Sequence, residues 1–183
     1  NMYGISPCAA MSILQSKGYI LGCEGDIEGV MSMLACDAVG ERQTPFLADL
    51  SQVNFEENYA LLWHCGVAPM NLWDGNCIRS LDTYFAGGRG VTAGFVMKSG
   101  RMNIMRIDSA RGKTRLFVQG GTVVPMEKEL TGTYAKVIFD KPVNEVLDTV
   151  TSTGLAHHLA MIYSDKLKAF KIFSKIMNYE LIE

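Results

Sequence analysis

The sequence lacks the features that mark nucleic-acid-binding and membrane proteins. It has no run of Lys and Arg, and its formal net charge is −2. A chain of that charge has little attraction for phosphate backbones or anionic lipid, so neither is an expected partner. No apolar stretch reaches the roughly 20 residues that cross a bilayer. We therefore expect a globular protein with no nucleic acid and no membrane among its partners.

The sequence also lacks a C-x-x-C pair, and its cysteines are odd in number. The five are Cys8, Cys23, Cys36, Cys65 and Cys77. Scattered, unpaired cysteines are typical of reduced thiols buried in the core of a protein that works in a reducing cytoplasm. A thiolate metal site or a catalytic cysteine is the alternative interpretation. The cytoplasm is the predicted location.

The chain has enough apolar residues for a sizeable core. Of its 183 residues, 48% are hydrophobic and 20% are charged, which predicts one domain or one and a half. The sequence begins with Asn1 rather than Met and passes at once into a segment with helical character. We therefore expect it to be a piece of a longer chain.

The first 45 residues alternate between helical and strand-like patterns. Residues 5–17 have apolar side chains at helical spacing, and a Gly at position 18 follows them. Residues 19–23 form a short apolar run that predicts a strand, and residues 27–38 predict a second helix. This order predicts the C-terminal end of a layered α/β domain over residues 1–45.

From residue 46 the pattern changes to short β-like runs joined by tight turns. These runs lie at residues 61–64, 90–97, 102–107, 114–119 and 134–139. Their regular spacing predicts an antiparallel sheet that closes into a β barrel. Residues 144–151 predict a short helix, and the apolar stripe over residues 155–179 predicts a longer, C-terminal one. The predicted fold class is α+β.

Carboxylates and imidazoles recur at the ends of these predicted elements. Glu24 follows the first strand, Asp49 lies at the change of pattern, and His64 ends another predicted strand. His157 and His158 open the last predicted helix. Carboxylate oxygen and imidazole nitrogen without thiolate suit Mn²⁺ or Mg²⁺.

Each of these polar residues also has a purely structural interpretation. Asp26 is well placed to cap the helix that follows it. A single His after an apolar strand, such as His64, is more often a hydrogen-bonded core residue than a ligand. Residues 157–158 could simply open a helix, and Asp49 could serve a turn. The pattern alone leaves these alternatives open.

Four short segments together resemble the L-fucose/L-arabinose isomerase superfamily. The order and spacing of the four agree with that family across nearly the whole chain. They are Cys23-Glu-Gly-Asp-Ile-Glu-Gly29, Phe46-Leu-Ala-Asp-Leu50, Trp63-His-Cys-Gly-Val-Ala-Pro69 and Gly154-Leu-Ala-His-His-Leu-Ala160.

The resemblance implies a metal-dependent aldose–ketose isomerase. It assigns Glu24 and Asp49 two roles, as metal ligands and as the acid/base pair that moves a proton between two sugar carbons. It makes His158 the imidazole ligand, chosen over His157 because the second His is the ligand in the arabinose branch. His64 matches a fourth ligand of that branch. The implied cofactor is Mn²⁺, or another divalent cation such as Mg²⁺ or Co²⁺.

The family also implies an architecture and partners. Residues 1–45 would end the second of two α/β domains, and residues 46–183 would form a C-terminal six-stranded β barrel with a closing helix. The implied partners are a fucose- or arabinose-like sugar and further copies of the chain, in a trimer or hexamer. A non-catalytic sugar-binding or assembly module is one alternative, and a sugar lyase or epimerase is another. The substrate-binding residues and the particular sugar stay open, because the chain departs from the family around residues 71–74 and after residue 158.

Overall fold

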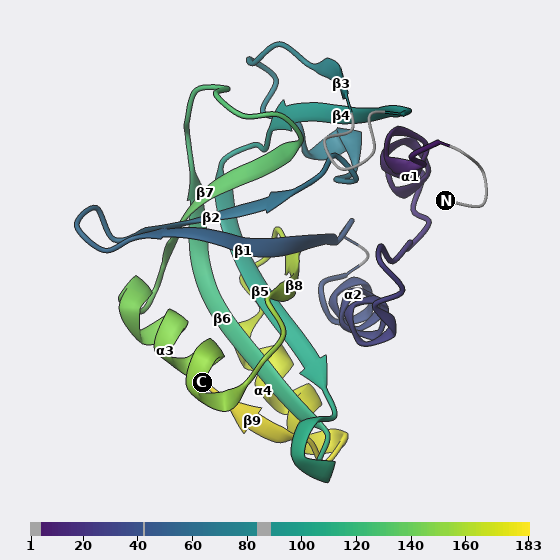
Figure 1. Cartoon of the computed structure of the whole chain (residues 1–183). Helices are drawn as coiled ribbons and strands as arrows, with labels where there is room; N and C mark the ends of the chain where they lie inside the picture. Colours follow the sequence, from purple (N-terminus) through teal and green to yellow (C-terminus); the bar gives the residue numbers. More distant parts are fainter. Residues whose placement is uncertain (1–4, 42, 84–88) are drawn as a thin grey trace.

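The computed structural model describes residues 5–41, 43–83 and 89–183. Two helices come first, and a sheet of nine strands with two further helices follows (Figure 1). The helices are α1 (Cys8–Gln15), α2 (Ile27–Val39), α3 (Val143–Thr153) and α4 (Leu167–Ile176). The first strands are β1 (Phe46–Asn54), β2 (Tyr59–His64), β3 (Ser80–Thr83), β4 (Val91–Val96) and β5 (Gly100–Asp108). The others are β6 (Arg115–Val124), β7 (Thr133–Phe139), β8 (His158–Ile162) and β9 (Glu180–Ile182).

The strands pair in the order β3-β4-β7-β2-β1-β8-β5-β6-β9, and β6 pairs with β7 as well. That extra pairing makes a closed circuit of six strands, β7-β2-β1-β8-β5-β6. The pairings are antiparallel except for β4 with β7 and β6 with β9. The predicted mixture of helices with a mainly antiparallel sheet is confirmed. A barrel in the strict sense, and the domain boundary after residue 45, stay predictions.

Both faces of the central strands are buried. Along β1, Phe46 and Ala48 belong to the core cluster on one face, and Leu47 belongs to the cluster under α2. Along β8, Leu159 and Met161 face the first cluster. Figure 1 shows α2 lying beside β8 and β5, where it covers the second face. The first half of β1 and the strand β8 that pairs with it are therefore held between two cores, with α2 on one side.

Burial on both faces explains the largest error of the sequence analysis. We predicted one helix over residues 155–179, but the structure has strand β8 and then the shorter helix α4. A strand buried on both faces has no alternation of apolar and polar residues, so its pattern cannot be told from that of a buried helix. His158 therefore opens a strand and not a helix.

The strand predicted at residues 19–23 is also wrong. The segment is irregular, and it has no pairing in the sheet that the described residues form. The predicted helices on either side are present as α1, which is shorter than expected, and α2. None of the described helices has the length and apolar character needed to cross a bilayer.

Candidate metal and active site

A tight turn before α2 carries the first predicted ligand. Glu24 has a φ of 58° and Gly25 a φ of 72°, so two successive residues are left-handed. The Asp26 N–H closes the turn on the Cys23 carbonyl at 3.0 Å. A left-handed residue other than Gly is uncommon, and such backbone strain concentrates at functional sites. The turn leaves the Glu24 side chain 63% exposed, with Oε2 3.7 Å from Nε2 of His158.

The sheet register brings the second and third predicted ligands together. Asp49 in β1 pairs directly with His158 in β8, and residues directly opposite on neighbouring strands have adjacent side chains. Asp49 Oδ1 lies 2.9 Å from His158 Nε2. A β-bulge follows at once, between Leu50 and Gln52. Bulges are frequent beside active sites, where they redirect side chains.

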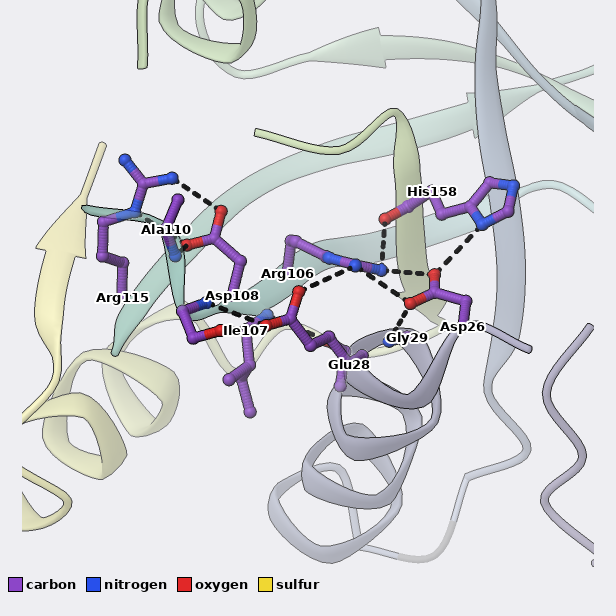
Figure 2. Close-up of polar contacts among 11 residues, drawn as sticks. Asp26, Glu28, Gly29, Arg106, Ile107, Asp108, Ala110, Arg115 and His158 are labelled. Carbon is purple, nitrogen blue, oxygen red and sulfur yellow. Dashed lines mark hydrogen bonds and ion pairs between the residues drawn. The ribbon is translucent and has the colours of Figure 1, made fainter. Parts of the chain in front are cut away.

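The other side of the His158 ring is fixed by a buried ion pair (Figure 2). Its Nδ1 lies 3.0 Å from Asp26 Oδ2. Arg106 from β5 donates to both oxygens of that carboxylate, at 2.6 and 3.0 Å, and its side chain is only 4% exposed. Asp26 also accepts a hydrogen bond from the Gly29 N–H, so it does cap α2 as the structural interpretation predicted. The carboxylate thus joins the helix, β5 and His158.

The charges of this network shift two pKa values in opposite directions. The Asp49 carboxylate raises the pKa of His158, burial of the ring opposes this, and Asp26 adds to the rise, which reaches about 9. Burial alone would raise the pKa of Asp26. The hydrogen bonds from Arg106 and from the Gly29 N–H outweigh burial and lower it to about 2. Asp26 is therefore a permanent anion at neutral pH.

The donor set fits a hard or borderline divalent cation. Glu24 and Asp49 each approach Nε2 of His158. Glu24, His64 and His158 each offer an atom within 4.8 Å of the others. Asp49, His157 and His158 do the same. Asp49 Oδ1 is buried and lies against two imidazoles, 2.9 Å from Nε2 of His158 and 3.5 Å from Nε2 of His157, so a cation bound there would take the place of these contacts. Glu24, Asp49 and His158 are the residues that could hold such an ion.

His157 and His158 differ in how they face this group. The His157 side chain is 69% exposed, and its Nε2 lies 3.5 Å from Asp49 Oδ1. The His158 side chain is 9% exposed and lies between Asp26 and Asp49. His158 is thus the more enclosed of the two rings, and its choice as the ligand stays a prediction.

His64 lies at the end of β2, next to β1 in the sheet, and is 1% exposed. The centroid of its ring is 5.9 Å from that of His158. The four residues predicted for the site are thus brought together from four parts of the chain.

A group of thiols lies beside Nδ1 of the His64 ring. Cys65 Sγ is 3.2 Å from His64 Nδ1 and 3.7 Å from Cys8 Sγ. Cys23, His64 and Cys65 offer ligand atoms within 4.8 Å of one another. All five cysteines are free, and three of them are buried. The reduced state of the thiols stays a prediction.

Sequence reasoning missed the residues that orient His158. It did not predict that Asp26 orients a histidine, and it attached no function to Arg106. Two signals were available. Asp26 follows Glu24 by two residues, and Arg106 interrupts the apolar run of β5, where a buried cation needs a counter-charge.

Comparison with known proteins finds relatives along the whole chain. The chain is 25% identical over 183 residues, all of its length, to the sulfoquinovose isomerase of Alkalicoccus urumqiensis. It is 26% identical over 180 residues, 98% of its length, to that of Priestia megaterium. A third, from a Clostridium species, is 24% identical over 168 residues, 89% of the chain. No protein-family profile matches the chain.

The match covers only part of each relative. The chain spans 41%, 40% and 37% of the lengths of these three proteins. Their shared name describes a sugar isomerase, which agrees with the class of reaction that the four motifs imply. The chain is therefore similar, from end to end, to a portion of the sulfoquinovose isomerases.

Proposed function

We propose that this chain carries the metal-binding and proton-transferring residues of an aldose–ketose isomerase that acts on a sugar. The observation that carries the proposal is the convergence of Glu24 and Asp49 on His158. The four motifs of the chain implied these residues, and the relatives that match all of it bear the name of a sugar isomerase.

Glu24, Asp49 and His158 would hold a divalent cation, with Mn²⁺, Mg²⁺ and Co²⁺ as candidates. When bound, the cation polarises the sugar carbonyl and stabilises the negative charge that develops on oxygen. Asp26 accepts a hydrogen bond from Nδ1 of His158 and so leaves the lone pair of Nε2 for the cation. This carboxylate–histidine arrangement is the usual support of an imidazole ligand.

Glu24 and Asp49 would share the proton transfer between the two sugar carbons. Glu24 stands on an exposed turn, where a substrate can reach its carboxylate, and Asp49 is fixed in the sheet beside His158. The fucose- or arabinose-like sugar implied by the motifs and the sulfoquinovose of the relatives' name are the first substrates to test.

The test is proton exchange at the sugar carbon next to the carbonyl. We expect the chain with Mn²⁺ to introduce deuterium from D₂O at C2 of its sugar, detected by NMR. Glu24→Gln keeps the shape of the side chain and removes the base, so exchange should stop while the circular dichroism spectrum and unfolding midpoint stay unchanged.

A matched control is Glu57→Gln. Glu57 is an exposed carboxylate that pairs with Lys136 on the sheet surface. Its replacement should leave exchange at the wild-type rate. Exchange in Glu24→Gln at a rate close to that of the wild type would contradict the assignment.

A further inference from the structure

The backbone forms a hydrogen bond with one ring nitrogen of His64. The N–H of Cys65 donates a hydrogen bond to Nδ1 of His64 at 2.8 Å. A backbone N–H can only donate, so Nδ1 must present its lone pair. In the neutral ring the hydrogen then resides on Nε2. The local backbone thus selects the tautomer of this imidazole.

The other nitrogen is buried and has no partner. Nε2 of His64 is inaccessible to solvent and makes no hydrogen bond with any described residue. It belongs to a side chain that is 1% exposed, and the ring lies beside His158. A buried donor without an acceptor destabilises the folded state. A ligand bound beside the candidate site residues would provide the acceptor that this donor lacks.

The thiol side of the ring offers no free nitrogen. Nδ1 lies 3.2 Å from Cys65 Sγ, but its lone pair already accepts the Cys65 N–H. The group of Cys23, His64 and Cys65 therefore lacks an available imidazole ligand, although the atoms are close. Cys23 also contacts the ring, and its hydrogen bonds with Cys65 and His64 lower the pKa of the Cys23 thiol. Nε2 is the ring nitrogen that is buried without a geometric hydrogen-bond partner among the described residues.

We propose that His64 donates a hydrogen bond from Nε2 to an oxygen of the bound sugar and is not a ligand of the metal. This rests on the proposed function and assigns His64 a role different from the one the arabinose branch implies. Nε2 cannot coordinate a cation while it carries a hydrogen, and the Cys65 N–H keeps that hydrogen there. A fixed hydrogen-bond donor that faces an oxygen stabilises the negative charge that this oxygen gains in the transition state.

The first experiment measures the tautomer directly. Long-range ¹H–¹⁵N NMR of the ¹⁵N-labelled chain distinguishes a lone-pair nitrogen from an N–H nitrogen in each imidazole. We expect Nδ1 of His64 to have the shift of a lone-pair nitrogen and Nε2 that of an N–H, both without metal and with Mg²⁺ added. His64 with its hydrogen on Nδ1 in either state would overturn the proposal.

The second experiment counts the imidazoles on the cation. Pulsed EPR of bound Mn²⁺ detects the nitrogen of each coordinated ring. We expect one coordinated ring, which is lost in His158→Gln and kept in His64→Gln and in the exposed-ring control His157→Gln. Two coordinated rings in the wild type, one of them lost in His64→Gln, would contradict the role of donor.

Turnover separates a donor from a residue that only fills space. The amide nitrogen of Gln reaches about as far as Nε2 of His, so His64→Gln keeps a donor, whereas His64→Leu keeps volume alone. We expect His64→Leu to lose about 100-fold in kcat, the loss typical of one donor to an oxyanion, and His64→Gln to recover at least tenfold of it. Equal losses in the two variants would overturn the proposal. If the wild type turns over no sugar, the function proposed above fails, and the NMR experiment still decides the tautomer.

Discussion

His158 and His64 lie with ring centroids 5.9 Å apart, and the chain holds them by contacts of opposite character. The Nδ1 of His158 faces an acceptor, the Asp26 carboxylate, and the Nδ1 of His64 faces a donor, the Cys65 N–H. The first contact leaves Nε2 of His158 able to bind a cation, and the second leaves Nε2 of His64 able to donate. The same residue type can therefore supply two different functions, which the partner of the remote nitrogen determines.

The contacts that hold the two imidazole rings in place also differ in kind. His158 depends on a charged network that runs from Asp26 to Arg106 and on to Glu28 (Figure 2). His64 depends on a single backbone N–H between apolar residues and thiols. The support of His158 can be broken by one side-chain substitution. The support of His64 resists side-chain substitution, because the donor belongs to the main chain.

The largest effect is expected from Arg106→Met, which removes the cation of this network. Asp26 would be left buried without its counter-charge, and breaking a buried ion pair costs about 3–5 kcal/mol of unfolding free energy. Urea denaturation measures that loss. The control is Arg101→Met, which breaks an exposed ion pair with Asp140 and should cost less than about 1 kcal/mol. Similar losses in the two variants would show that Arg106 does not hold the network together.

The next largest effect is expected from Asp26→Asn, which removes the negative charge that faces Nδ1 of His158 but keeps a good helix cap. Mn²⁺ affinity should fall about 10–100-fold, the usual effect of losing a carboxylate that orients a ligand. Titration calorimetry measures it. Asp148→Asn, at an exposed position on α3, should bind Mn²⁺ as the wild type does. Unchanged affinity in Asp26→Asn would contradict the role given to Asp26.

A smaller effect is expected from pH in the metal-free chain. The folded pKa of His158, about 9, is above its ordinary value of 6.5, so the charged ring stabilises the fold. That contribution is fully present below about pH 6.5 and is lost as the pH rises through about 9. The urea midpoint in the presence of a chelator should therefore fall over this interval in the wild type, and His158→Gln should lack this part of the fall. If the urea midpoints of the wild type and His158→Gln changed identically with pH, the charged state of the His158 ring would be contradicted.

The smallest effect is expected from Cys65→Ser. The substitution changes the thiol and leaves the N–H that holds His64, so the tautomer should be unchanged and turnover should stay within about threefold of the wild type. NMR and steady-state kinetics check the two outcomes. A reversed tautomer in this variant would show that the thiol, and not the backbone, selects it.

The sequence predicted that the candidate site residues lie close together, but it did not predict the contacts that hold them in place. Glu24, Asp49, His64 and His158 were singled out because each lies in a short segment that resembles the L-fucose/L-arabinose isomerase superfamily, and the structure brings all four together. Their roles as ligands and as acid and base stay predictions. Asp26 and Arg106 are 80 residues apart, so only the folded chain reveals their ion pair. The orientation of His64 depends on one backbone hydrogen bond, which no side-chain pattern encodes.

The fold was predictable where local signals agreed with tertiary packing. The helix α2 has a capping Asp26 and a clear end, and the strands of the β5–β6 hairpin have recognisable turns. Strand β8 was hidden because both of its faces are buried. The run at residues 19–23 resembled a strand by composition alone, and a strand also needs a partner.

The most direct test of the account is the position of a bound cation. Crystals of the chain soaked in Mn²⁺ should give an anomalous difference peak at the manganese edge, within coordination distance of Glu24, Asp49 and Nε2 of His158. The account also predicts that the peak lies too far from Nε2 of His64 for a bond. A peak among the thiols of Cys23 and Cys65, or no peak at a saturating concentration of Mn²⁺, would contradict it.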